Sequence, residues 1–161
     1  MSAPEHRFLI VKIQKNEYRR ALVMVRESFN ALCAKDFTES GGASFLRYAS
    51  LHNFSARQKK GHVTFIAKEG ARLAGMVELR ETGHITMLFV SPETIGRGCG
   101  SALLTHAIDR CKQANGKKQS SITLNASPYA HGFYLKKGFF DDGETVDDDG
   151  LIYTPMRLYI S

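Results

Sequence analysis

Apolar residues along the chain fall into two patterns, short runs of strand length and longer stretches with helical spacing. The short runs predict strands at 8–13, 63–67, 73–79, 84–90, 122–125, 139–140 and 152–160. Apolar positions three and four apart predict helices after an N-cap at Asn16, over 43–55, beyond the glycines at 96–100 and over 129–137. Turn residues at 41–42, 69–70, 82–83, 115–116 and 138, and a basic loop at 57–60, separate these elements.

The order of these elements predicts one domain rather than two. A strand, two helices, three strands, a helix, a strand, a helix and two strands follow one another across residues 1–161, with no repeat and no linker. Strands joined by short turns pair antiparallel. We therefore expect a single α/β (α+β) domain, since a chain of this length can bury one core.

The stretch from 84 to 104 carries the clearest sign of a ligand site. An apolar strand ends at Pro92, which lacks the N–H that a central strand needs. Gly96, Gly98 and Gly100 then occupy alternate positions, where the missing Cβ atoms let a ligand approach the backbone. An amphipathic helix follows, and its N-terminal N–H groups together with Arg97 favour a bound pyrophosphate.

Two common phosphate loops do not fit this spacing. A Walker loop requires a lysine directly after its last glycine, and this stretch has none. A dinucleotide-binding fingerprint requires a third glycine, where this chain has Ser101 or Leu103.

The stretch resembles instead the acetyl-CoA loop of the GNAT superfamily of acyltransferases, in which Gln/Arg-x-x-Gly-x-Gly/Ala follows a Val-x-Pro strand end. Gly98 and Gly100 match the two small positions, and the Val-Ser-Pro sequence at 90–92 matches the strand end. Ile95 departs from the pattern, since Gln or Arg is usual there. Segments 124–130 and 133–139 resemble the family's fifth strand, its fourth helix and its Phe-Tyr-x-x-x-Gly-Phe ending. The resemblance is weakest over residues 1–60.

The resemblance implies a mixed, mostly antiparallel sheet of about seven strands, splayed between strands four and five, with about four helices on both faces. It also implies acetyl-CoA as the acyl donor, with its pantetheine arm along the backbone between the splayed strands. By position, the donor site would consist of Leu88, Phe89 and Val90 on strand four, the loop residues Ile95, Gly96, Arg97, Gly98, Cys99, Gly100 and Ser101, and Asn125 as a partner for a pantetheine amide.

Acetyl transfer to an amine needs a base for the ammonium proton and benefits from an acid for the departing thiolate. Tyr134 falls where many family members have a tyrosine general acid, and the alternative is an aromatic residue of the core. His84 stands at the position of the glutamate base in the histone-acetylating branch, and histidine accepts a proton near neutral pH. Glu78, acting through water, is the alternative base, whereas His131 is expected to line the cofactor groove. Cys99 is interpreted as structural, although a helix N-terminus can lower the pKa of a thiol.

Composition limits the other functions. A hydrophobic content of 43% is typical of a globular protein, and no apolar run approaches the length of a membrane helix. The three cysteines lack the spacing of a zinc site, and the polar segment 1–7 is not a secretory signal, so we expect a cytoplasmic protein without metal. The net charge is +6, but the basic residues are scattered, which argues against nucleic acid as a partner.

Six of the sixteen acidic residues gather between the last two strands, at Asp141, Asp142, Glu144, Asp147, Asp148 and Asp149. One interpretation is a solvated hairpin loop that turns at Asp149-Gly150. In the resembling family this connection lies over the acceptor mouth, where the acids would steer a cationic amine.

The resemblance therefore predicts an acetyl-CoA-dependent N-acetyltransferase for a small-molecule or lysine-type amine, with a homodimer as one available assembly. Polyamines and aminoglycoside-like amines are among the acceptors expected. The alternative is a non-catalytic acyl-CoA-binding or regulatory module with the same fold.

Overall fold

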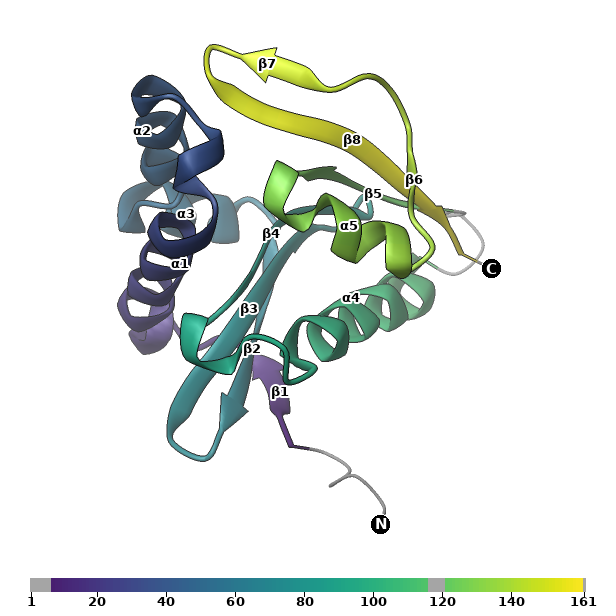
Figure 1. The fold of residues 1–161 in the computed structure, drawn as a ribbon. Helices are drawn as coiled ribbons and strands as arrows, with labels where there is room; N and C mark the ends of the chain where they lie inside the picture. The colour runs from purple at the N-terminus through teal and green to yellow at the C-terminus, as the bar shows by residue number, and fades with distance from the viewer. Residues whose placement is uncertain (1–6, 116–120, 161) are drawn as a thin grey trace.

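The computed structural model describes residues 7–115 and 121–160, within which eight strands form one sheet and five helices cover it (Figure 1). The strands are β1 (Leu9–Lys12), β2 (Val63–Glu69), β3 (Arg72–Arg80), β4 (His84–Val90), β5 (Ser121–Ala126), β6 (Phe140–Asp141), β7 (Val146–Asp148) and β8 (Leu151–Tyr159). The helices are α1 (Tyr18–Leu32), α2 (Glu39–Tyr48), α3 (Leu51–Lys59), α4 (Cys99–Asn115) and α5 (Pro128–Lys136). Among these helices, none has the length and apolar character needed to cross a membrane.

The strand order is β1-β2-β3-β4-β5-β8-β6, and β7 pairs with β8 beside this path. Neighbouring strands pair antiparallel except β4 and β5, which are parallel. This confirms the predicted mixed, mostly antiparallel sheet. The described residues contain one strand and one helix more than expected, because β7 forms inside the acidic segment and the second predicted helix is divided.

Alternation along the central strands sends apolar side chains to both faces of the sheet, and each face has its own core. On one face, α4 contributes Leu103, Leu104 and Ala107 to a cluster with Val77 and Leu79 of β3. On the other face, residues of α1 and α3 pack on Met76 and Met87 in a second cluster. Neighbouring positions 76 and 77 of β3 thus belong to different cores, as the strand period of two requires.

β4 and β5 pair only where the beginning of β4 meets the middle of β5. His84 lies opposite Thr123 and Ile85 lies opposite Leu124, and the described pairing between the two strands stops there. The later part of β4 therefore presents its backbone to the gap rather than to β5. This is the splay that the family resemblance implied.

A β-bulge lies on β4 at the point where the splay begins. Glu78 of β3 pairs with Met87, whereas the next residue, Leu79, pairs with Ile85, so Thr86 is the extra residue. A bulge bends its strand and increases the local twist. Here it also places Thr86 on the same face of the sheet as Glu78, whose carboxylate accepts the Thr86 hydroxyl hydrogen bond at 2.8 Å.

Three predictions are wrong in the region of α2 and α3. Gly41 and Gly42 do not break the chain but lie in the first turns of α2, which is capped by Thr38. The predicted helix over 43–55 ends at Tyr48, and Ser50 caps a new helix, α3. The segment 57–60, predicted as a basic loop, is largely the last turn of α3.

The predicted cap at Asn16 is also wrong, because Gln14 and Glu17 form a capping box around a short 3-10 helix that precedes α1. At the other helices the predicted ends hold. The Ser127 side chain caps α5, and Gly138 follows the end of that helix with φ of 94°. α4 ends at Asn115, while the other half of its predicted stop, Gly116, and the polar segment 1–6 lie outside the described residues.

The turn between β7 and β8 rests on the start of α2. The Thr38 N–H donates to the Gly150 carbonyl at 3.3 Å, and the Ser40 hydroxyl donates to the Asp149 carbonyl at 3.3 Å. A Cβ atom on Gly41 would overlap the Gly150 carbonyl, and a Cβ on Gly150 would overlap the Thr38 hydroxyl. The two glycines thus allow two backbones that are distant in sequence to touch. Figure 1 shows the β7–β8 turn beside α2.

We expect Gly150→Ala to destabilise the fold more than Gly70→Ala. Both glycines have positive φ, 88° and 61°, and each substitution adds a conformational cost of about 1–2 kcal/mol. The alanine at 150 additionally displaces Thr38, whose side chain caps α2, at a further cost of about 1 kcal/mol. Thermal unfolding should therefore show a Tm for Gly150→Ala that is lower by about 2–4 °C than that of Gly70→Ala. Equal Tm values would mean that the hairpin does not rest on α2 in solution.

Candidate functional site

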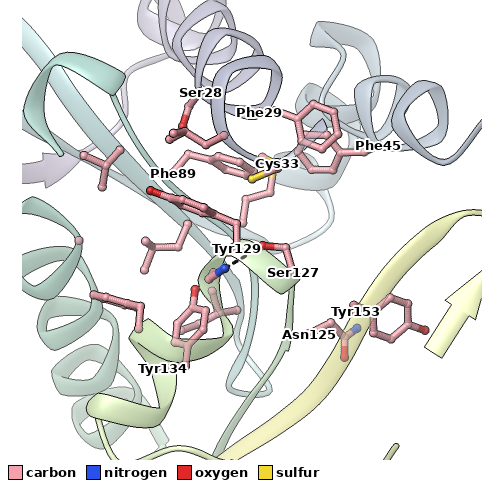
Figure 2. A pocket seen from close by; sticks show the side chains of 18 of the residues that line it. Ser28, Phe29, Cys33, Phe45, Phe89, Asn125, Ser127, Tyr129, Tyr134 and Tyr153 are labelled. Carbon is pink, nitrogen blue, oxygen red and sulfur yellow. Dashed lines mark hydrogen bonds between the residues drawn. The ribbon is translucent and has the colours of Figure 1, made fainter. Parts of the chain in front are cut away.

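The splay between β4 and β5 opens into a cavity of about 890 Å³. Its lining comes from α1, α2, the ends of β3 and β5, β4, the first turn of α4, α5 and the β7–β8 hairpin, so segments distant in sequence meet there (Figure 2). The cavity extends from the glycine-rich stretch at one end to aromatic residues of α1 and α2 at the other. One cavity is therefore lined both by the predicted donor site and by aromatic residues of α1 and α2.

The glycine-rich stretch forms a loop that only glycine accommodates readily. Gly96 and Gly98 have φ of 77° and 88°, a region that side chains with Cβ atoms avoid. α4 begins at Cys99, directly after this loop, and the first N–H groups of a helix have no partner within the helix. A Cβ on Gly100 would lie 3.5 Å from the Phe133 ring, so the loop packs close to α5. Backbone donors and the helix dipole make this end suited to an anion.

Most of the residues predicted for the donor site line the cavity. These are Leu88, Phe89, Val90, Ile95, Gly96, Gly98, Cys99, Gly100, Ser101 and Asn125. Arg97 is the exception, since it is not among the lining residues and its guanidinium contacts the Glu69 carboxylate at 2.5 Å. That hydrogen bond is the main cause that holds the pKa of Glu69 below its usual value. Arg97 therefore stabilises the loop from outside, against the β2–β3 turn.

Tyr134 lines the middle of the cavity from α5 (Figure 2). Its side chain is 5% exposed, and its ring packs edge-on against Phe133 and Phe139. Burial raises the pKa of Tyr134 far above its usual value, with a further contribution from Cys33. The hydroxyl consequently stays protonated across the physiological range and can act as a proton donor. The packing is that of a core aromatic residue, and the acid role stays a prediction.

His84 lies at the closed end of the splay and also lines the cavity. Its Nδ1 atom is 2.8 Å from the Thr123 hydroxyl oxygen on β5. Burial, reinforced by the nearby charges of Arg80 and His62, lowers the pKa of His84. The imidazole is therefore neutral at pH 7, and Nε2 can accept a proton in the tautomer whose Nδ1–H donates to Thr123.

Glu78, the alternative base, is fully buried beneath the cavity and is not among its lining residues. Arg57 donates to both carboxylate oxygens, at 3.1 and 3.2 Å, and Gln58 donates at 2.7 Å. Thr86 does line the cavity, so its hydroxyl is the link from Glu78 to the site. The sequence did not identify Arg57 and Gln58 as partners of Glu78, because a run of basic residues usually lies on the solvated surface.

The three cysteines are free and buried. Burial raises the pKa of Cys99 to about 11, so the helix N-terminus does not make this thiol acidic. Cys33 was not singled out from the sequence, yet it lines the cavity and its thiol lies within hydrogen-bonding reach of Ser127. Across the described ranges, no three His, Cys, Asp or Glu side chains gather as a metal site would require.

The acidic segment does not act as one cluster. Asp141 contacts His131 at 2.6 Å, and Asp142 contacts Arg157 at 3.0 Å. The Asp147 carboxylate accepts the Gly150 N–H at 2.8 Å, which stabilises the predicted turn. Asp148 is the acid of this segment that lines the cavity. His131, expected in the cofactor groove, is instead committed to Asp141 and is not among the lining residues.

Comparison with protein families gives a match to the acetyltransferase (GNAT) domain over residues 33–160. Among solved structures, a GCN5-related N-acetyltransferase from Rhodopseudomonas palustris is 25% identical, with a TM-score of 0.81 over 99% of this chain and 100% of that one. The PaiA N-acetyltransferase from Thermoplasma acidophilum, in complex with coenzyme A, is 21% identical, with a TM-score of 0.74 over 99% and 100% of the two chains. No curated protein matches the sequence.

A polyamine enzyme is also similar in fold. The spermidine N-acetyltransferase from Vibrio cholerae, in complex with coenzyme A and spermine, is 17% identical, with a TM-score of 0.67 over 95% of each chain.

We expect Gly98→Asp to abolish the rise in Tm that coenzyme A causes in the unmodified protein. A ligand that binds only the folded state raises Tm by mass action, and a carboxylate in this loop would repel a pyrophosphate. Gly61→Asp is the matched control, since Gly61 also has positive φ and open space around it but lies outside the cavity. A normal coenzyme A shift in Gly98→Asp would exclude the loop as the phosphate site.

Proposed function

The chain belongs to the GNAT acetyltransferase family, and from this premise we propose that it transfers the acetyl group of acetyl-CoA to a small primary amine by direct attack. The observation that carries the proposal is the continuous cavity, which reaches the glycine loop, Tyr134 and the acceptor side without a break. The acyl donor and the amine can therefore meet in one ternary complex.

The donor half of the cavity has the chemistry that coenzyme A requires. The loop at 96–100 supplies backbone donors at a helix N-terminus for the pyrophosphate. The part of β4 that no longer pairs with β5 offers main-chain groups to the pantetheine arm, in the manner of an added strand. Asn125, at the end of β5, supplies a side-chain amide on the opposite side. Because these contacts come mostly from the backbone, the isoleucine at position 95 does not prevent them.

The reaction needs a neutral amine, although an alkylamine has a pKa of about 10.4 in water. A base must take the ammonium proton before nitrogen attacks the thioester carbon. The C–N bond then forms, the attacking nitrogen gives up a second proton, the C–S bond breaks, and the sulfur receives a proton. We assign that last proton to Tyr134, because its buried hydroxyl is protonated and lines the cavity.

We assign the base to His84, because it is neutral and lines the same cavity. The alternative is Glu78, which would take the proton through the Thr86 hydroxyl. That carboxylate already accepts hydrogen bonds from Arg57 and Gln58, and it does not line the cavity itself.

The amine is proposed to be a small molecule, as in the polyamine enzymes of similar fold. A reducing compartment such as the cytoplasm suits the three free thiols. The homodimer stays a prediction.

Tyr134→Phe should lower kcat for acetyl transfer by about 10-fold to 10³-fold and leave acetyl-CoA affinity unchanged. The measurement is thiol release from acetyl-CoA across a panel of primary amines, which also tests the proposed activity. Tyr159→Phe removes one hydroxyl from an exposed ring of β8 outside the cavity and serves as the control. Acetyl-CoA binding without turnover of any amine would indicate the non-catalytic module instead.

The acidic limb of the kcat/KM profile should have its midpoint below pH 6.5, because the pKa of His84 is lowered by burial. Activity falls as the pH is lowered, because the imidazole becomes protonated and can no longer accept the amine proton. His84→Gln should remove this limb, whereas His52→Gln, an exposed histidine of α3, should leave it in place. A limb that persists unchanged in His84→Gln would transfer the base role to Glu78 and Thr86.

A further inference from the structure

We propose that the amine acceptor of this site carries one positive charge, on the reacting nitrogen, and a flat apolar body that packs against a wall of four phenylalanines. The wall consists of Phe29, Phe37, Phe45 and Phe89, all of which line the cavity. This inference rests on the proposed acetyl transfer and names its substrate class.

The four rings form one continuous surface although they come from distant parts of the chain. Phe29 of α1 stacks on Phe45 of α2 with centroids 4.4 Å apart and planes at 23°. Phe37, in the connection between these helices, lies 5.4 Å from Phe29, and Phe89 of β4 lies 5.4 Å from Phe45. Figure 2 shows Phe29, Phe45 and Phe89 grouped on one side of the cavity. Aromatic surfaces at such spacings accept a further ring by stacking or edge contact.

The rings are arranged to contact a ligand rather than only one another. Phe29 is 2% exposed and supports the wall from behind. Phe37, Phe45 and Phe89 are half-buried, and each remains part of the cavity surface. Phe89 also belongs to the stretch of β4 beside the splay, so the wall adjoins the point where the amine must attack.

The described lining of the cavity offers one carboxylate to a cation. Asp148 supplies it, and Arg80 is the cationic side chain of the same lining. His84 is neutral at pH 7 because its pKa is lowered by burial. A polyamine would bring several ammonium groups into an apolar space with one acid to pair them, and unpaired buried charges are strongly unfavourable. A monoamine gives its ammonium proton to the base as it reacts, so it leaves no unpaired charge in the cavity.

The test compares acetylation of 2-phenylethylamine, hexylamine and spermidine by the full chain. The rate is measured as thiol release from acetyl-CoA. We expect kcat/KM to be at least 10-fold higher for 2-phenylethylamine than for spermidine, with hexylamine between them. Phe45→Leu should lower kcat/KM for 2-phenylethylamine about 2- to 10-fold, mainly through KM, and reduce its advantage over hexylamine. Phe140→Leu, on β6 outside the cavity, is the matched control. It should change neither kcat/KM for 2-phenylethylamine nor the preference for this amine over hexylamine.

Each outcome separates this inference from the proposed function. Spermidine as the fastest substrate would overturn the inference while supporting acetyl transfer. If no amine is acetylated, the proposed function fails, and calorimetric titration of 2-phenylethylamine into the protein with coenzyme A then decides whether the wall binds it. Absence of heat in that titration overturns the inference. A retained coenzyme A shift in Tm shows that Phe45→Leu is folded, and Phe37→Leu repeats the test at a second ring.

Discussion

The site depends on one constraint in the sheet, the limited pairing of β4 with β5. After two residue pairs the strands diverge, so the rest of β4 keeps one edge of main-chain N–H and C=O groups without a neighbouring strand. Backbone groups of this kind need partners, and an exposed strand edge readily binds an extended chain. The bulge at Thr86 lies where the divergence begins and bends β4 there. The cavity and the free edge of β4 both follow from this separation.

The buried Glu78 carboxylate and its partners stabilise the same region of the sheet. Glu78 is on β3, directly opposite the bulge, and Arg57 and Gln58 come from α3. Removing a carboxylate from water is favourable only when such partners replace its hydration. The Arg57 guanidinium also lies 3.6 Å from the centre of the Tyr48 ring and donates to the Tyr48 carbonyl. The end of α2 is therefore linked through Arg57 to the centre of the sheet, which positions the acceptor side relative to β4.

The sequence predicted the second half of the chain far better than the first. β4, α4, β5 and α5 have strong local signals, namely an apolar run ended by Pro92, glycines at alternate positions and a Ser127-Pro128 helix start. The cavity residues in these elements were therefore identified before the fold was known. Over α2 and α3 the local signals misled, since Gly41 in a helix is explained only by its contact with Gly150, more than a hundred residues away. The phenylalanine wall was missed for a similar reason, because Phe29 and Phe45 have the spacing of ordinary core residues. No local pattern distinguishes a ring that faces a core from one that faces a cavity.

The contact between Gly41 and Gly150 has a consequence for motion. The β7–β8 hairpin extends beyond the end of β5, and in the described part of the chain its turn hydrogen-bonds to the start of α2. Separation of the hairpin would expose the Thr38 cap and the first turn of α2 at the same time. We therefore expect the amide protons of these two segments to exchange with solvent at a common rate, as a single cooperative unit. The side of the cavity that α2 and the hairpin line would then open in one step.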